Sequence, residues 1–409
     1  MYNVRTVCRA CSHPELKPVF DLGLAPLANN FHGRDEQCSG YCPVKVMFCE
    51  LCTLAQLSVV VDPQILYSNY CYETSKSETM RLHFRALWDA IKQQSKAESV
   101  IEIGSNDGDL LEFSRQNGAD QVVGIDAAEN LAHVAIQRGI QTIIGILDDE
   151  TARCAASVVP NPDVIIARHV FAHADDWHAF IRNLDTMAAL ETLVAIEVPY
   201  VVDTLARLEF DQVYHEHLSY VSLTAVEALL DGTPFRIQKV MRFPIHGGSI
   251  VIFLRRRDHP SEVDPSVQEF LNSEHITEQT WNWFSAQSHT CIQHLKNKVS
   301  DLLGMKAAKR TGVTIAGFGA SAKSTVWISA CGFTNKEIKF ICDCTPGKQG
   351  KFSPGADIPI VPESEMMNQK PDYAIIFSWN YADEIIRKNQ NYLDAGGHFI
   401  IPGLTIRVV

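Results

Sequence analysis

The sequence lacks the long apolar runs that mark membrane spans. No window reaches the roughly 20 residues that a transmembrane helix needs, and the first residues carry no apolar stretch like that of a signal peptide. Short tandem repeats and low-complexity tracts are absent as well. Hydrophobic residues make up 46% of the chain and charged residues 21%, which is typical of folded globular proteins. We therefore expect a folded cytoplasmic protein that works without a membrane.

Concentrated positive charge is also scarce. The chain has 36 Lys and Arg against 48 Asp and Glu, a formal net charge of -12, and its one basic run is the short Arg255–Arg257. Phosphate backbones are bound by clustered Lys and Arg, so the composition argues against nucleic acid as a partner. The oligomeric state cannot be read from the sequence. At 409 residues the chain is long enough for two or three domains.

Cysteine is present but unevenly distributed, because six of the 12 cysteines fall in the first 52 residues. Two Cys-x-x-Cys pairs can present four thiolates to one zinc ion and leave no open position, which is the pattern of a structural site. A redox dithiol is the competing interpretation, but neither pair precedes a helix in a thioredoxin-like setting. Cys38 or Cys42 could replace one pair, or be small buried residues. The predicted Zn²⁺ ligands are Cys8, Cys11, Cys49 and Cys52.

An apolar strand that ends in an acidic, glycine-containing turn occupies Val100–Gly108. Gly104 and Gly108 let the backbone turn tightly beside a ligand, and Asp107 can face a cation such as a sulfonium. About twenty residues later Asp126 ends a second strand, where a carboxylate can bind ribose hydroxyls. The pattern predicts S-adenosylmethionine as cofactor, and a Rossmann-like turn without a methyl donor is the alternative. The predicted cofactor contacts are Glu102, Gly104, Asn106, Asp107, Gly108 and Asp126.

Strand-like and helical segments alternate over residues 100–253 and again from residue 313 onward, which predicts doubly wound α/β sheets. Between them, residues 260–309 are helical in pattern, and Trp281, Trp283 and Phe284 are expected to dock against a neighbouring domain. The predicted fold class is α/β, with a Rossmann-like class I methyltransferase core. The predicted domains are a small zinc-binding domain over 1–72, the methyltransferase core over 73–258, and a helical connector with a second Rossmann-like domain over 259–409.

The densest group of polar side chains is Tyr214-His-Glu-His217. Methylation of carbon requires that a proton leave a carbon beside a carbonyl while a donor stabilises the enolate oxygen. His217 could remove this proton near neutral pH, Tyr214 or His173 could donate to the oxyanion, and Glu216 could orient its neighbours. A zinc site on His215 and His217 would have too few ligands, and a purely structural polar cluster is the other alternative.

His173 lies just beyond the carboxyl end of the expected strand 164–167, where open α/β sheets bind ligands. Tyr72 lies between the zinc-binding segment and the sheet. Its ring could cover the methyl donor or touch the acceptor, and core packing is the alternative. Both residues join the predicted catalytic group.

The segment Gly317–Lys323 ends a strand and opens a helix, so that backbone amides, Ser321 and Lys323 could hold a diphosphate at the helix amino end. Lys348 and Lys351 supply two more cations in a following loop. A glycine turn with solvated lysines is the alternative. A methyl-donor site in one sheet and a nucleotide site in the other suggest a nucleotide-diphosphate sugar as the acceptor.

These motifs resemble those of the S-adenosylmethionine-dependent C-methyltransferases of deoxysugar biosynthesis, and the resemblance spans nearly the whole chain. It rests on the paired Cys-x-x-Cys turns and on the following segments: Glu102–Gly108, Glu197–Tyr200, Tyr214–Tyr220, His246–Ser249, Gly317–Lys323 and Trp379–Glu384. The resemblance implies methylation at carbon 3 of a nucleotide-linked 4-keto-6-deoxysugar, with His217 as base. It also implies that His246 belongs with Gly317, Ser321, Lys323, Lys348 and Lys351 in binding the substrate.

Two rival functions remain open at this point. An enzyme of the same architecture could methylate a non-sugar carbon, an oxygen or a nitrogen, and the chain could be a non-catalytic zinc-containing binding protein.

Overall fold

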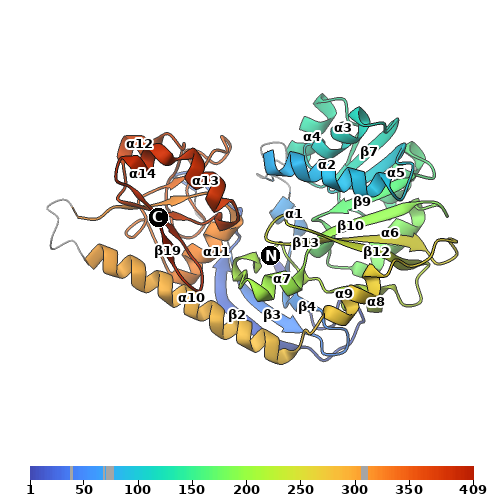
Figure 1. The fold of residues 1–409 in the computed structure, drawn as a ribbon, viewed down its shortest axis with the longest axis horizontal. Coiled ribbons are helices and arrows are strands. Elements are labelled where there is room, and N and C mark those ends of the chain that lie inside the picture. Colours follow the sequence, from blue (N-terminus) through green and yellow to red (C-terminus); the bar gives the residue numbers. More distant parts are fainter. Residues whose placement is uncertain (37–39, 68–69, 71–77, 305–311) are drawn as a thin grey trace.

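The computed structural model describes residues 1–36, 40–67, 70, 78–304 and 312–409, and within these the strands form four sheets (Figure 1). Tyr72 and Cys38 lie outside the described residues, so the predictions made for them are not addressed. No helix in the described ranges has both the length and the apolar character to cross a membrane.

The amino-terminal part is built from antiparallel strands. A four-stranded sheet has the order β11-β4-β3-β2, and β1 pairs with β5 in a separate ribbon. Side chains of β3 alternate between buried and more exposed positions, as expected for a sheet with one face on a core. One strand of this sheet, β11, comes from far along the chain and pairs with β4. The elements are β1 (Tyr2–Val4), β2 (Lys17–Pro26), β3 (Tyr41–Phe48), β4 (Ala55–Leu57), β5 (Val59–Val61), α1 (Pro63–Tyr67) and β11 (Ser219–Tyr220).

The central part is a seven-stranded sheet of order β12-β13-β10-β9-β6-β7-β8, parallel from β8 to β10, with β13 antiparallel to both of its neighbours. All five residues of β9 are buried, as expected of a parallel strand covered on both faces. This is the sheet of a class I methyltransferase, which confirms the predicted core. Its strands are β6 (Ser99–Ile103), β7 (Gln121–Asp126), β8 (Thr142–Ile144), β9 (Val164–Arg168), β10 (Leu193–Pro199), β12 (Phe235–Phe243) and β13 (Ser249–Arg256).

Helices cover both faces of this sheet. Helices α5, α6 and α8 share one apolar core with it, and α2, α3 and α4 share another. Alternate strand residues enter different cores: Ile165 belongs to the first and Ile166 to the second. The helical elements are α2 (Glu78–Lys92), α3 (Asp109–Gln116), α4 (Glu129–Gln137), α5 (Asp149–Val158), α6 (Trp177–Met187), α7 (Val201–Ala206), α8 (Leu223–Leu230) and α9 (Ser266–Ser273), with single 3₁₀ turns η2 (Phe171–His173) and η3 (Phe210–Gln212).

The carboxyl-terminal part is a second α/β unit with strand order β16-β15-β14-β17-β18-β19, in which only β19 is antiparallel. Strand β14 is central and leads through a glycine turn into α11, the Rossmann-like arrangement that the sequence predicts. The elements are β14 (Ile315–Phe318), α11 (Ala322–Cys331), β15 (Ile341–Cys342), β16 (Ile360–Val361), α12 (Glu365–Gln369), β17 (Tyr373–Ile376), η5 (Trp379–Tyr381), α13 (Ala382–Lys388), α14 (Gln390–Asp394), β18 (His398–Ile401) and β19 (Arg407–Val408).

One long helix, α10 (Glu278–Gly304), runs past β2 and β3 to the carboxyl-terminal unit (Figure 1). Its buried face joins the apolar core that also contains residues of the amino-terminal sheet, α11 and β14. Phe284 packs edge-on against Phe20 of β2 at 5.3 Å between ring centroids. Trp281 and Phe284 are fully buried as expected, but Trp283 is 48% exposed and faces away from this core.

We expect Phe284→Ala to lower the free energy of unfolding by about 3–5 kcal/mol, because it removes a buried ring and leaves a cavity between α10 and β2. Urea unfolding followed by far-UV circular dichroism measures the change. Trp283→Ala, one residue earlier on the same helix but exposed, is the matched control and should cost about 0.5 kcal/mol or less. Equal losses in the two variants would contradict the packing described.

Candidate active site and metal centre

The four paired cysteines lie together, with all four Sγ atoms within 4.8 Å of one another. The Sγ atoms of Cys8 and Cys52 are 3.4 Å apart, and those of Cys11 and Cys49 are 3.6 Å apart. Each Cys-x-x-Cys segment forms the same turn: the amide of Ser12 donates to the carbonyl of Cys8, and the amide of Thr53 donates to the carbonyl of Cys49. Four soft, largely buried donors at this spacing fit a tetrahedral structural zinc ion. Cys42 is not a member, since it packs with Leu27 and Val61.

The loop after β6 takes the shape that its glycines predict. Gly104 and Gly108 have φ angles of 72° and 77°, in the region that favours glycine. A Cβ on Gly104 would lie 3.0 Å from Cβ of Val170, and one on Gly108 would lie 2.9 Å from Cβ of Ala135. Neither position has room for a side chain, because Val170 and Ala135 already lie beside it, so the two glycines keep this loop as a tight backbone turn, here called the cradle.

Asp126 joins this loop to the next one. Its Oδ2 accepts a hydrogen bond from the amide of Asn106 at 2.6 Å, and its Oδ1 accepts from the amide of Ala128 at 2.8 Å. Burial raises the pKa of Asp126, and the two amide donors oppose that rise. The carboxylate thus stands at the carboxyl ends of β6 and β7, where ribose hydroxyls bind in such sheets.

Two other predicted cofactor residues are buried beside arginines. An Oδ atom of Asp107 lies 3.7 Å from the Arg138 guanidinium, and an Oε atom of Glu102 lies 3.6 Å from that of Arg168. Burial raises the pKa of Glu102 to about 8, and Arg168 opposes the rise. Glu102 lies within β6 rather than in the loop, so its placement indicates that it supports the loop from the strand that precedes it.

His217 and Tyr214 form a hydrogen-bonded pair. His217 Nδ1 is 2.8 Å from the carbonyl oxygen of Gln212, and its Nε2 is 2.9 Å from the Tyr214 hydroxyl. A carbonyl can only accept, so Nδ1 carries the proton, and the Nε2 lone pair accepts from Tyr214. Burial, followed by nearby His173, holds the pKa of His217 well below its usual value. The imidazole is therefore neutral near pH 7, with its basic nitrogen at Nε2.

His173 ends η2, just after β9, and its ring neighbours that of His217. The two rings are 5.2 Å apart between centroids, and Tyr67 stacks on the far side of His173 with its hydroxyl 3.4 Å from Nδ1. Burial lowers the pKa of His173 to about 4. This second imidazole is also neutral at physiological pH.

Glu216 is buried beside this group, and each of its two carboxylate oxygens accepts a hydrogen bond. Its Oε1 accepts from the Asn29 side chain at 2.7 Å and its Oε2 from the Tyr70 hydroxyl at 2.9 Å. Burial raises the pKa of Glu216 to about 7, and the two donors oppose the rise. The carboxylate orients residues from the amino-terminal part toward the site.

His246 belongs to a second group of histidines at the same edge of the sheet. Its ring meets that of His169 edge-on at 4.8 Å, and Glu197 reaches both His169, at 3.8 Å, and His83, at 2.7 Å. Burial lowers the pKa of His246 to about 3. His169 and His246 both have positive φ angles, 52° and 53°, which are uncommon for residues with a Cβ.

The predicted diphosphate loop follows β14. Gly317 lies inside the strand, where a Cβ would be 3.0 Å from atoms of both Ile341 and Phe377, so its smallness serves packing between layers. The turn itself is made by Gly319, with a φ of 88°. Ser321 caps α11 by accepting from the amide of Ser324 at 3.3 Å.

Lys323 points away from the loop toward the methyltransferase core. Its Nζ lies 3.2 Å from Oδ1 of Asp211 and 4.9 Å from the ring centre of Trp379. The ammonium is thus already paired with a carboxylate, whereas the sequence predicts a cation that binds diphosphate or, in the alternative, a solvated one.

Lys348 is buried against the turn, where Nζ donates to the carbonyl of Ala320 at 2.9 Å and lies over the ring of Phe31. Lys351 is half-buried three residues later. Of the three predicted lysines, Lys348 is the one whose ammonium binds the backbone of the turn before α11.

Several residues of this site were not found from the sequence: Asn29, Tyr67, Tyr70, Asp211 and Gln212. Tyr70 falls in the stretch that directed attention to Tyr72, two residues later. Asn29, Tyr67 and Asp211 have no local pattern, because their partners are distant in the sequence. Gln212 is close to His217 in the sequence but binds it through a backbone carbonyl, which no side-chain pattern marks.

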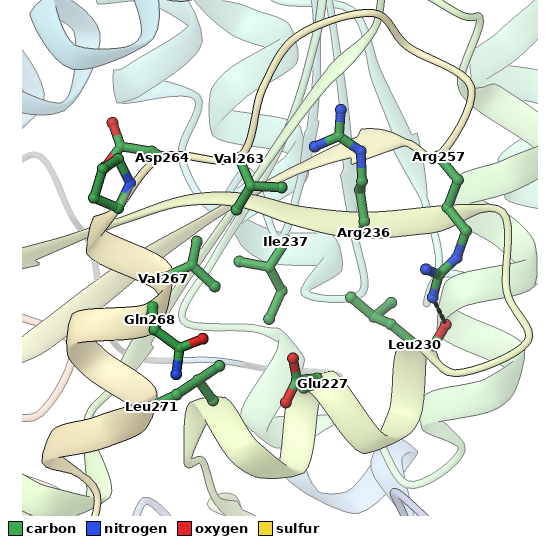
Figure 2. A pocket seen from close by; sticks show the side chains of 11 residues that line it. Glu227, Leu230, Arg236, Ile237, Arg257, Val263, Asp264, Val267, Gln268 and Leu271 are labelled. Atoms are coloured by element: carbon green, nitrogen blue, oxygen red, sulfur yellow. Dashed lines mark hydrogen bonds between the residues drawn. The ribbon is translucent and has the colours of Figure 1, made fainter.

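A pocket of about 410 Å³ lies elsewhere, between α8, α9 and β12. Figure 2 shows Ile237, Val267 and Leu271 facing into it, with Arg236 and Arg257 near its rim. None of its lining residues belongs to the histidine groups or the loops described above.

Comparison with known proteins gives consistent matches along the chain. Family models described as "Putative zinc binding domain", "Methyltransferase domain" and "C-methyltransferase C-terminal domain" match residues 8–67, 77–240 and 244–403. The chain is 34% identical over 407 residues to the C-methyltransferase NovU of Streptomyces niveus, which covers 98% of this chain and 96% of that protein.

Solved structures match the chain only in part. The PH0226 protein of Pyrococcus horikoshii has a TM-score of 0.36 and 12% identity, covering 48% of this chain and 97% of that one. A magnesium protoporphyrin IX methyltransferase from Synechocystis has a TM-score of 0.33 and 15% identity, covering 44% and 82%. Likenesses at this level support no functional argument.

We expect the purified protein to hold about one zinc ion per chain, and Cys49→Ser to lose it and to unfold at a lower temperature, because a structural ion stabilises the fold that binds it. Elemental analysis and thermal unfolding measure both effects. Cys42→Ser changes a buried cysteine outside the cluster and should keep its zinc. Loss of zinc from Cys42→Ser with retention in Cys49→Ser would contradict the ligand set.

Proposed function

The chain belongs to the C-methyltransferase family and is an S-adenosylmethionine-dependent C-methyltransferase, and from this premise we propose that its acceptor is a nucleotide-linked 4-keto-6-deoxysugar methylated at carbon 3. The observation that carries the proposal is the His217–Tyr214 pair, which offers a neutral base and a phenol donor side by side. Carbon methylation beside a ketone requires both groups.

In the proposed reaction His217 Nε2 removes the proton from the carbon next to the ketone, and the C–H electron pair moves into an enolate. Because Nε2 has a single lone pair, the Tyr214 hydroxyl must first turn from Nε2 to the ketone oxygen of the bound acceptor, and it then donates to the enolate oxygen that forms. Burial raises the pKa of Tyr214 well above 10, which keeps that hydroxyl protonated. S-adenosylmethionine, when bound, would supply the methyl group as an electrophile to the enolate carbon, and S-adenosylhomocysteine would leave with the electron pair of the broken S–CH₃ bond.

The chain has backbone and carboxylate groups suited to hold that cofactor. We assign its binding to the cradle of Gly104 and Gly108, to Asn106, and to Asp126 at the end of β7. Glu102 and Asp107 support this loop from buried positions beside Arg168 and Arg138. We assign His173, whose ring neighbours that of His217, and Glu216, which binds Tyr70, to the walls of the acceptor site.

For the nucleotide diphosphate we assign the turn from Gly319 to Ser321 at the amino end of α11, together with Lys348 and Lys351. Backbone amides at a helix amino end favour phosphate. Here the donors must come from Ser321 onward, because the amides of Gly319 and Ala320 already bind the carbonyl of Cys342 and Oδ2 of Asp343.

Lys323, in the first turn of α11, remains part of the proposed site. It is not assigned to the charge of the diphosphate, because Asp211 neutralises its ammonium. His246 would meet the sugar from the sheet edge.

The decisive experiment uses methyl-labelled S-adenosylmethionine, a panel of nucleotide-linked 4-keto-6-deoxysugars and deuterated water, with products analysed by mass spectrometry and NMR. We expect a labelled methyl on carbon 3 with the wild-type enzyme. His217→Ala should lower kcat by a factor on the order of 10²–10⁴, while calorimetry shows unchanged cofactor binding. Methylation of oxygen or nitrogen, or a fully active His217→Ala, would refute the proposal.

We expect the methylation rate to fall as pH drops through about 7, because Glu216 has its pKa raised to about 7 and must be ionised to accept from both Asn29 and Tyr70. His217, whose pKa is lowered, stays neutral in that range. The pH dependence of kcat/KM measures this acid limb.

Two variants test its assignment to Glu216. Tyr70→Phe removes a donor that stabilises the ionised carboxylate, so the limb should move to higher pH. Glu216→Gln should remove the limb from its residual activity. An unchanged limb in both variants would assign it to another group.

A further inference from the structure

Asp211 is a buried carboxylate at the contact between the methyltransferase core and the carboxyl-terminal unit. It lies on η3 and is 1% exposed. Its Oδ1 accepts from Lys323 Nζ at 3.2 Å, and its Oδ2 accepts from the indole nitrogens of Trp327 at 3.1 Å and Trp379 at 2.6 Å. All three donors come from the carboxyl-terminal unit, on α11 and η5.

The same short turn holds the histidines of the site. The carbonyl of Gln212, the residue after Asp211, accepts from His217 Nδ1 at 2.8 Å. The Gln212 side-chain amide donates to the carbonyl of His246 at 2.9 Å. Phe210, the residue before Asp211, packs on Trp327 at 4.4 Å between ring centroids.

We infer that Asp211 is a positioning residue for the base, through which the docked carboxyl-terminal unit fixes the turn that presents His217. The inference rests on the proposed function in one respect, the role of His217. With the turn fixed, the Gln212 carbonyl holds the proton on Nδ1 and keeps the lone pair on Nε2, where the Tyr214 hydroxyl donates to it until an acceptor binds. The Asp211 side chain thereby joins the carboxyl-terminal unit, to which the nucleotide is assigned, to the turn that presents the proposed base His217.

The chemistry of the contact explains why a carboxylate is needed. Three donors converge on two oxygens, and one donor is a cation whose side chain is only 13% exposed. An ionised carboxylate satisfies all three, whereas an amide would turn its own N–H groups toward either the lysine or the indoles. Loss of the charge also leaves Lys323 as a buried unpaired cation, which moves or draws in water.

The test is Asp211→Asn in the full-length zinc-containing enzyme. We expect kcat to fall by a factor on the order of 10–100, as for a small misplacement of a reacting group, with an unchanged KM for S-adenosylmethionine. Histidine ¹⁵N NMR should show loss of the uniform Nδ1–H tautomer of His217, whose signal is identified by its absence in His217→Ala. A merely structural residue would not change that tautomer.

Matched variants separate the contact from general damage. Trp379→Phe removes one donor and should lower kcat in the same direction, whereas Trp281→Phe changes a buried indole whose nitrogen has no hydrogen-bond partner among the described residues, and should keep kcat. Asp163→Asn controls for lost stability, because Asp163 accepts from the amides of Glu98 and Ser99 at the amino end of β6, opposite the site.

The outcomes also separate this inference from the proposed function. Wild-type kcat and an unchanged His217 tautomer in Asp211→Asn, together with an inactive His217→Ala, would overturn the role of Asp211 alone. An active His217→Ala would instead overturn the proposed base. Equal losses of kcat in Asp211→Asn and Asp163→Asn at equal loss of stability would reduce Asp211 to a structural residue.

Discussion

The active site depends on one segment, residues 210–220, which all three parts of the chain bind at once. Donors of the carboxyl-terminal unit bind Asp211, and in the core the Gln212 side chain donates to the carbonyl of His246. In the amino-terminal part the carbonyl of Cys42 accepts from His215, and β4 pairs with Ser219 and Tyr220. Because the proposed base lies between these contacts, and not on a strand, its position is set by the relative placement of the three parts. A segment held from several sides loses little entropy when a substrate arrives, which is the advantage of a preorganised site.

The core of the fold could be predicted from the sequence because its signals are local. The strand expected at 164–167 is β9, which ends only one residue later, and the loop at Gly104–Gly108 follows from positions that only glycine adopts easily. The amino-terminal sheet could not be predicted in this way. Register shifts between Pro18 and Phe20, and between Asp21 and Leu24, break the alternation that identifies a strand. Strand β11 is two residues long and pairs far along the chain, so no local pattern marks it.

The candidate site shows the same division. His217, Tyr214, Glu216 and His173 were predicted because their chemistry suits enolate formation, and the structure brings them together. Lys323 was predicted from its place after a glycine turn, yet its ammonium faces Asp211, 112 residues away. Ion pairs and burial are properties of the folded chain, so the sequence could nominate a cation but not its partner. The same limit hid Asn29, whose amide donates to Glu216 from the amino-terminal part.

The metal centre acts on this arrangement through Arg9, which lies between two of the cysteines. Arg9 is fully buried, and its guanidinium donates to the carbonyls of Leu57 and Leu218 and pairs with Asp175. Burial lowers the pKa of Arg9 to about 10, with Asp175 opposing the fall, so the side chain remains charged. Leu218 follows the base directly in the chain. A zinc ion on Cys8 and Cys11 would fix the turn that carries Arg9 and, through it, the backbone beside the proposed base His217, without touching the substrate.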